Sequence, residues 1–329
     1  MGLGAVVGVC PATAATLAPQ RVSDPSFTIA VIPDTQRETK TAGDPRISHR
    51  NRWLIDHRED LDLRFAAQVG DLTDWGWLVP AQLTRASSAF RLFEDAGVPY
   101  SIAVGNHDTR TVGIGGSAYV YGPDCLARFS PGMCRSPVLL RHTEEINDVF
   151  DTGRFGNVRG AFEAGKIDNV YSTFRAEGYS WLVLDLEIWP RQEVVAWANR
   201  VVKDHPDANV VVNTHAYLTG KGAIDSNAHN GVTSARELWE QLISRHENIW
   251  LVTCGHAGRA ATRVDRGVNG NKVVTLLTTM HKTATNSNPV RLVQLDPRAG
   301  VMRTRLVGPM NDQQFPHHSA TVEGLHFVR

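Results

Sequence analysis

The stretch LRFAAQVGDLTDWG, residues 63–76, joins a run of apolar residues to a polar cluster that contains Asp71 and Asp74. A short apolar run bounded by turn residues is typical of a buried strand. In folds that alternate strands and helices, the loops after the carboxyl ends of parallel strands meet at one edge and form ligand sites. The stretch therefore predicts a buried strand that delivers two carboxylates to such an edge.

Four other stretches repeat this arrangement of an apolar run followed by polar side chains. More strands are expected at residues 179–188, 272–281 and 290–297, and helices near residues 53–62, 80–96, 192–203 and 234–246. The alternation predicts an α/β fold. The four stretches are FTIAVIPDTQ (27–36) with Asp34 and Gln36, VPYSIAVGNHD (98–108) with Asn106, His107 and Asp108, ANVVVNTHAYL (208–218) with His215, and NIWLVTCGHAG (248–258) with His256.

The chain of 329 residues, 42% of them hydrophobic, is long enough to bury a large core. We expect one α/β domain over residues 26–310, and an insertion at about residues 109–166, where Gly, Pro and Arg are frequent and periodicity fades. Residues 311–329 are expected to form a C-terminal tail.

The overall charge is balanced, with 34 acidic and 34 basic residues. This balance gives no electrostatic reason to expect a nucleic-acid groove or an anionic membrane partner. No apolar run reaches the roughly 18 to 20 residues that a membrane-spanning helix needs, so no transmembrane segment is expected.

Residues 1–25, rich in small and apolar residues, are typical of the end of an export signal with its cleavage region. The basic start of such a signal is missing, so the alternatives are a disordered tail and a cytoplasmic protein.

Cys125 and Cys134 flank a short loop. In an oxidising compartment they could form a disulfide, and otherwise they would be two separate buried thiols.

The polar blocks resemble those of the calcineurin-like metallophosphoesterase superfamily, which run D-x-H, G-D-x-x-D, G-N-H-D/E, a lone histidine after a strand, and G-H-x-H. The resemblance extends from Thr28 to about Gly308 and implies two mixed β-sheets packed as a sandwich flanked by helices. It also implies two divalent metal ions. Asp71 would bridge them, Asp34 would bind the first, and Asn106, His215 and His256 would complete the second. His107 would face the phosphate, with its ring oriented by Asp74.

The mixture of oxygen and imidazole ligands suits Mn, Fe, Zn or Co at a hydrolytic centre. Two such ions can polarise a phosphoryl oxygen and lower the pKa of a shared water for attack on phosphorus. His107 can act as an acid or stabilise the developing charge. Any one of these blocks alone could be an exposed turn, a helix cap or a structural histidine, but all of them occur in the family's order.

Two departures from the family pattern fall on the first metal. Gln36 stands where the family commonly has histidine, as in a bacterial branch with D-T-Q, and Gly258 replaces the second histidine of the last block. The first site is therefore expected to be weaker, with Gln36 as an oxygen ligand or a hydrogen-bond donor to bound water. The strand-like run 272–281 ends in His281, followed by Lys282, and either side chain could fill the vacancy. The alternative is an ordinary exposed strand end.

The sequence thus predicts an enzyme that hydrolyses a small phosphorylated substrate through a metal-activated water. Phosphodiesters are favoured over monoesters, because the sequence shows no cluster of extra cations for a doubly charged monoester. One alternative is an inactive protein that binds phosphorylated ligands, and another is a structural or adhesive exported protein. A serine esterase is disfavoured because no G-x-S-x-G motif occurs.

Overall fold

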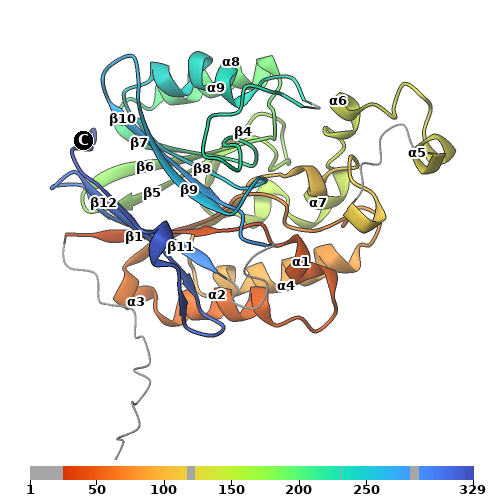
Figure 1. Ribbon diagram of the computed structural model, residues 1–329, viewed down its shortest axis with the longest axis horizontal. Coiled ribbons are helices and arrows are strands. Elements are labelled where there is room, and N and C mark those ends of the chain that lie inside the picture. The colour runs from red at the N-terminus through yellow and green to blue at the C-terminus, as the bar shows by residue number, and fades with distance from the viewer. Residues whose placement is uncertain (1–24, 117–122, 230, 282–288) are drawn as a thin grey trace, which may run out of the picture.

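The structure is a computed structural model that describes residues 25–116, 123–229, 231–281 and 289–329. Two mixed β-sheets pack face to face, and helices cover the outer side of each sheet (Figure 1). The predicted α/β sandwich is therefore confirmed. Most of the expected export segment lies outside the described residues, and so does Lys282.

The first sheet has β1 near its middle, paired in parallel with β2 and antiparallel with β11. β2 is in turn parallel to β3. Among the described residues its strand order is β13 (Gln313–Gln314), β12 (Val301–Gly308), β11 (Val290–Asp296), β1 (Phe27–Ile32), β2 (Leu63–Gln68) and β3 (Tyr100–Ile102), and β14 (Ala320–Val322) also pairs with β12.

The second sheet contains a parallel run from β6 through β7 and β8 to β10. Antiparallel strands complete it on both sides. Within the described part of the chain its order is β4 (Val158–Ala161), β5 (Val170–Ala176), β6 (Tyr179–Leu186), β7 (Ala208–Thr214), β8 (Ile249–Cys254), β10 (Lys272–Thr278) and β9 (Ala260–Arg266).

Helices form the two outer layers, with α2 and α4 below the first sheet and α8 and α9 above the second in Figure 1. The helices expected at residues 80–96 and 192–203 match closely, and the one expected at 234–246 ends early, at Gln241. The helix expected at residues 53–62 begins earlier and breaks at His57. The helices are α1 (Gln36–Lys40), α2 (Arg46–Asp56), α3 (Arg58–Leu61), α4 (Ala81–Asp95), α5 (Pro123–Arg128), α6 (Ser136–Leu139), α7 (Glu144–Val149), α8 (Gln192–Asp204) and α9 (Ala235–Gln241).

Three apolar layers hold the sandwich together. The middle layer lies between the sheets and includes Phe27, Val31, Trp181 and Trp250. The outer layers lie between each sheet and its helices. Because successive side chains of a strand point to opposite faces, a strand in the interior must be apolar on both faces. The largely apolar strand β1 is accordingly buried at every position.

A buried polar network joins the two sheets. The Ser101 hydroxyl of β3 donates to Asp185 Oδ1 at 2.9 Å, and Asn213 Nδ2 donates to the same oxygen at 2.7 Å. Asn213 also donates to the Gln68 carbonyl of the first sheet at 3.0 Å. Hydrogen bonds between buried polar groups fix the relative position of the elements that carry them, here the ends of strands in both sheets.

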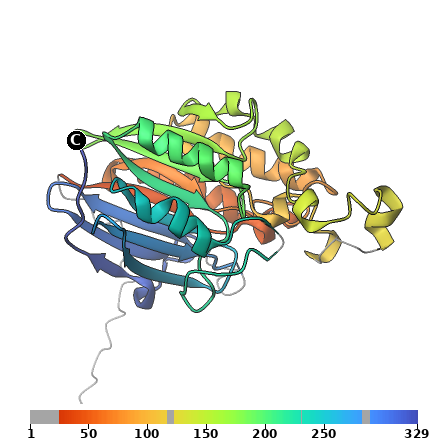
Figure 2. The same cartoon turned by 90° about the horizontal axis from the view of Figure 1, so that it is seen from above.

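The region after β3 contains short helices in place of regular sandwich elements. Segment 123–139, with α5 and α6, projects at one end of the molecule in both views (Figures 1 and 2). A disulfide joins Cys125 to Cys134 within it. The later part of the region packs on the main body, because Ile146, Phe150 and Phe155 belong to the core beneath the first sheet.

The expectation that residues 311–329 form a tail is wrong. β14 pairs antiparallel with β12, and Leu325 lies in the core layer between the sheets. The segment is therefore an integral part of the first sheet's edge.

None of the described helices combines the length and the apolar character that crossing a membrane requires.

Candidate metal centre

The predicted ligands follow the carboxyl ends of parallel strands, and Gln36 is the first residue of α1. Asp34, Asp71 and Asn106 follow β1, β2 and β3 of the first sheet, whereas His215 and His256 follow β7 and β8 of the second. Since parallel strands bring their carboxyl ends to one edge, and the sheets are stacked, the two sets of loops meet. The fold thus brings together side chains that are far apart in sequence.

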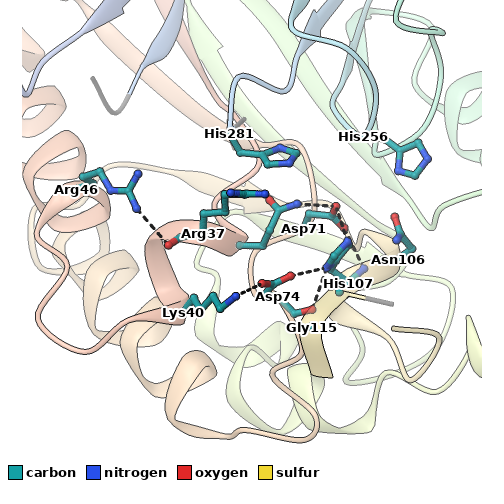
Figure 3. Close-up of a pocket in the computed structure, with 12 residues that line it drawn as sticks. Arg37, Lys40, Arg46, Asp71, Asp74, Asn106, His107, Gly115, His256 and His281 are labelled. Atoms are coloured by element: carbon teal, nitrogen blue, oxygen red, sulfur yellow. Dashed lines mark hydrogen bonds and ion pairs between the residues drawn. The ribbon is translucent and has the colours of Figure 1, made fainter. Parts of the chain in front are cut away.

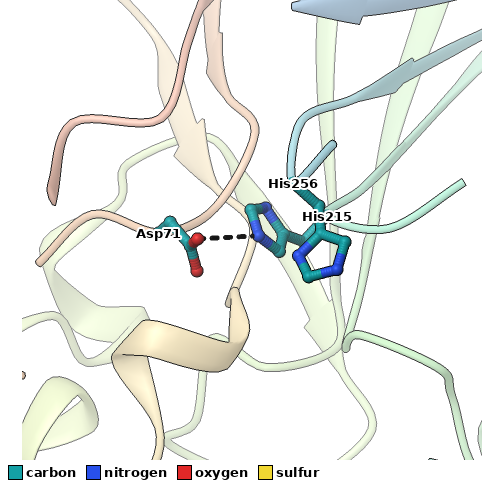
Figure 4. A group of neighbouring side chains, drawn as sticks. All are labelled: Asp71, His215 and His256. Atoms are coloured by element: carbon teal, nitrogen blue, oxygen red, sulfur yellow. Dashed lines mark ion pairs between the residues drawn. The ribbon is translucent and has the colours of Figure 1, made fainter. Parts of the chain in front are cut away.

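Asp71, His215 and His256 form a compact group whose potential ligand atoms lie within 4.8 Å of one another (Figure 4). His215 Nε2 lies 3.1 Å from Asp71 Oδ2, and the ring is fully buried. Its Nδ1 lies 2.8 Å from the Val69 carbonyl, which can only accept, so Nδ1 carries the proton. Such a bond turns Nε2 toward the group, which is the orientation that a metal-binding histidine requires.

Several buried polar atoms at this edge have no hydrogen-bond partner among the described residues. An unsatisfied buried polar atom costs roughly 1–3 kcal/mol, so a convergent group of them calls for a ligand. Oxygen and imidazole nitrogen atoms together are a donor set that suits divalent transition-metal ions. The residues present therefore fit the metal centre that the sequence predicts. The atoms are Asp34 Oδ1, Gln36 Oε1, Asn106 Oδ1, His215 Nε2 and His281 Nδ1.

The backbone packs closely around the side chains of Asp34 and Asp71. Asp34 Oδ2 accepts a hydrogen bond from the His256 backbone N–H at 3.2 Å. A Cβ atom on Gly255 would collide with the Asp34 carboxylate, so only glycine fits before His256. Asp71 and His256 themselves have left-handed backbone, with φ of 52° and 70°. A residue other than glycine with left-handed backbone dihedral angles raises the free energy of the fold, and such residues are concentrated at functional sites.

The charged side chains of the group shift one another's pKa values. Burial by itself would raise the pKa of Asp71, but nearby His215 and His107 outweigh it and hold that pKa below its usual range. Burial, followed by repulsion from His215, lowers the pKa of His256 to about 4. Asp71 is therefore ionised and His256 is neutral at physiological pH, which are the forms that bind cations.

His107 lies beside this group and is held by Asp74. Its Nδ1 lies 2.9 Å from Asp74 Oδ1 and 2.9 Å from the Asp74 carbonyl, and its Nε2 lies 4.0 Å from Asp71 Oδ2. Burial alone would lower the pKa of His107, but the Asp71 and Asp74 carboxylates outweigh it and raise the pKa to about 9. The imidazole is therefore protonated near neutral pH, with Asp74 fixing its orientation.

Asp108 has a role that the sequence did not reveal. Its carboxylate accepts hydrogen bonds from the backbone N–H groups of Leu72, Thr73 and Gly105, at 3.0, 2.9 and 3.0 Å. These bonds tie the loop of Asp71 to the loop of His107. Asp108 thus positions two parts of the site without facing the cavity.

A cavity of about 520 Å³ opens over these residues (Figure 3). Arg37, Lys40 and Arg46 line it together with Asp71 and His107. The sequence pattern did not reveal this group of cations, although Arg37 and Lys40 lie within four residues of Gln36. The expectation that the site lacks extra cations, on which the preference for diesters depended, is therefore wrong.

Gln36 and His281 also line the cavity. Gln36 Nε2 donates to Asp71 Oδ2 at 3.3 Å, which directs its amide group toward the predicted ligands. His281 Nδ1 lies 3.6 Å from Asp34 Oδ2. The alternative that His281 is an ordinary exposed strand end is therefore wrong, because its side chain is 8% exposed and faces the site.

Comparison with known proteins agrees with this geometry. Residues 27–277 match the calcineurin-like phosphoesterase family. The chain is 22% identical over 241 residues to the protein YvnB of Bacillus subtilis (strain 168), covering 73% of this chain but only 16% of that protein's length.

The chain was also compared with solved structures, and the first of the two that follow shares its fold. A dimetal phosphatase from Danio rerio has a TM-score of 0.52 at 14% sequence identity, with 90% of this chain and 98% of that chain covered. GAP50, the anchor in the inner membrane complex of Plasmodium, has a TM-score of 0.48 at 10% identity, covering 92% and 90%. The family match spans most of the chain: the chain belongs to the calcineurin-like phosphoesterase family.

Proposed function

We propose that this protein hydrolyses small phosphoesters at a centre of two divalent ions. Asp34 and the Gln36 amide oxygen would hold the first ion, Asp71 would serve both ions, and the remaining ligands would hold the second. The observation that carries this proposal is the convergence of unpartnered, buried oxygen and nitrogen atoms at one edge of the sandwich. The remaining ligands of the second ion are Asn106, His215 and His256.

The protein's own groups have separate tasks in this proposal. Bound ions polarise a phosphoryl oxygen and lower the pKa of a water molecule. His107 donates from Nε2 into the cavity, where it stabilises negative charge that develops on the phosphoryl group or protonates the leaving oxygen. Asp74 holds Nδ1 and keeps the donating edge of the ring turned toward the substrate.

The cations of the cavity bear on the class of ester. Lys40 Nζ lies 3.6 Å from Asp74 Oδ2, and Arg46 pairs with Asp44 at 2.6 Å, so part of their charge is already balanced. A phosphodiester, favoured from the sequence, needs little additional positive charge. A monoester is the second candidate, because Arg37, Lys40 and Arg46 would favour its extra negative charge.

Rates on matched aryl phosphate substrates test the proposal. With added Mn²⁺ we expect turnover of an aryl phosphodiester or monoester that chelator abolishes and that Asn106→Ala reduces at least about 100-fold, since that change removes a ligand. Asn269→Ala, on an exposed turn, is the matched control and should retain activity. Tight metal-dependent phosphate binding without turnover would instead show an inactive binding protein.

The two ions are expected to differ in how firmly they are held. The second site has two imidazoles, whereas Gln36 replaces an imidazole in the first. Elemental analysis after mild chelation should therefore find about one ion per chain. Two ions retained equally through increasing chelator concentration would contradict this order.

We also propose that the protein is exported. The Cys125–Cys134 disulfide supports this, because disulfides persist in oxidising compartments. The expected signal, residues 1–25, agrees with that location. Fractionation of cells should find the protein outside the cytoplasm with this segment removed, and an uncut cytoplasmic protein would refute export.

A further inference from the structure

The chain cannot place a histidine where the family's last block has its second one. Gly258 has a left-handed φ of 66°, and a Cβ atom there would lie 2.6 Å from Gly220 Cα. Real Cβ atoms do not approach backbone atoms so closely, so any side chain at this position would require the backbone to move. Any imidazole ligand of the first ion must therefore come from another part of the chain.

The loop after β10 lies beside the vacant position. β10 is parallel to β8, with Leu277 opposite Cys254, so both strands deliver their following loops to the same edge. Thr279 links the loop after β10 to the loop after β8. Its N–H donates to the Arg259 carbonyl and its hydroxyl to the Ala257 carbonyl, both at 2.8 Å. Met280 then takes a left-handed φ of 57°. His281 follows this turn, and its side chain points into the cavity (Figure 3).

The imidazole of His281 has the position of a ligand. Its Nδ1 is buried, has no hydrogen-bond partner among the described residues, and lies 3.6 Å from Asp34 Oδ2. That separation is too long for a hydrogen bond between nitrogen and oxygen. Two donor atoms, each about 2.1 Å from one tetrahedral ion, lie about 3.4 Å apart. The separation of Nδ1 from Asp34 is therefore the one expected of two ligands to a shared cation.

We propose that His281 is the imidazole ligand of the first ion, together with Asp34, Asp71 and Gln36. The inference rests on the proposed metal centre and deepens it. The ligand that position 258 cannot supply comes from the neighbouring parallel strand. The first site then has one imidazole against two in the second, so the first ion is still expected to leave first.

Substitution by cysteine gives a direct test. Nδ1 is the ring nitrogen closer to the backbone, so a cysteine thiolate at position 281 can reach nearly the same ion position. We expect the full-length His281→Cys protein, loaded with Co²⁺, to gain a near-ultraviolet sulfur-to-cobalt charge-transfer band. The wild type sets the baseline, since its free Cys254 is buried in the core. His49→Cys, on an exposed position of α2, is the matched control and should give no band.

Metal affinity gives a second measurement that does not depend on a new ligand. His281→Ala should weaken binding of the more labile ion at least about 100-fold in a Mn²⁺ titration and leave the tighter ion unchanged, because only the first site loses a ligand. His49→Ala should retain both affinities. Circular dichroism confirms that each variant is folded.

Two results would overturn the inference. One is a folded His281→Cys protein that binds two Co²⁺ ions without the band, and the other is unchanged affinity for both ions in His281→Ala. Either would make His281 a partner of Asp34 or of the substrate. The outcome is separate from that of the proposed function: a wild type that binds two ions through His281 but turns over no phosphoester would refute only the activity.

Discussion

Asp71→Asn is expected to empty the metal centre and lower turnover at least about 1000-fold, which corresponds to roughly 4 kcal/mol of transition-state stabilisation. Asp71 is the carboxylate common to both proposed sites. Its Oδ2 lies 3.1 Å from His215 Nε2 and accepts from Gln36, while its Oδ1 accepts from the His107 backbone at 3.0 Å. Asparagine preserves the shape of the side chain but removes the charge that two neighbouring cations require.

Elemental analysis and steady-state kinetics on the same preparation check this result. Asp312→Asn is a suitable control, because Asp312 is exposed and has the same left-handed backbone, with φ of 54°. It should retain both metal content and activity. A folded Asp71→Asn protein with two ions and normal turnover would show that Asp71 does not bridge the ions.

His107→Ala is expected to reduce turnover by about 100-fold to 10,000-fold while leaving the metal content unchanged. The reason is the position of the ring: Asp74 holds Nδ1 at 2.9 Å, and Nε2 faces the cavity beside Asp71. Removing the ring removes a proton donor near the reacting phosphate. None of the proposed metal ligands is altered by this change.

The distinction between donor and ligand is made by measuring ions and rates together. Loss of metal along with activity in His107→Ala would make His107 a ligand. His107→Gln supplies a second comparison, since its amide can donate a hydrogen bond but cannot protonate a leaving group. Partial recovery of turnover in that variant would indicate charge stabilisation, and none would indicate acid catalysis.

The sequence by itself determined the class of fold and predicted five ligand residues, which the structure places at one edge of the sandwich. Each of these residues directly follows an apolar run, so the local pattern of a buried strand ending in polar side chains was sufficient to find it. The pairing of such strands in parallel then requires their loops to meet. The residues are Asp34, Asp71, Asn106, His215 and His256.

The C-terminal segment shows where local pattern fails. β13 has two residues and β14 has three, which is too short for any periodicity to appear. Their strand character comes from hydrogen bonds to β12 and from burial of Leu325 between the sheets. Both are tertiary interactions, so residues 311–329 could only be interpreted as a tail.

Only the tertiary structure decided what surrounds the metal centre. Arg37, Lys40 and Arg46 line the cavity because α1 and the start of α2 pack against its rim, and five helical residues are too few to predict which face is turned inward. The sequence alone left open whether His281 faces the site. The β8–β10 pairing and the hydrogen bonds of Thr279 place its Nδ1 3.6 Å from Asp34 Oδ2. Strand order and loop direction depend on contacts between distant parts of the chain, which a local sequence pattern does not encode.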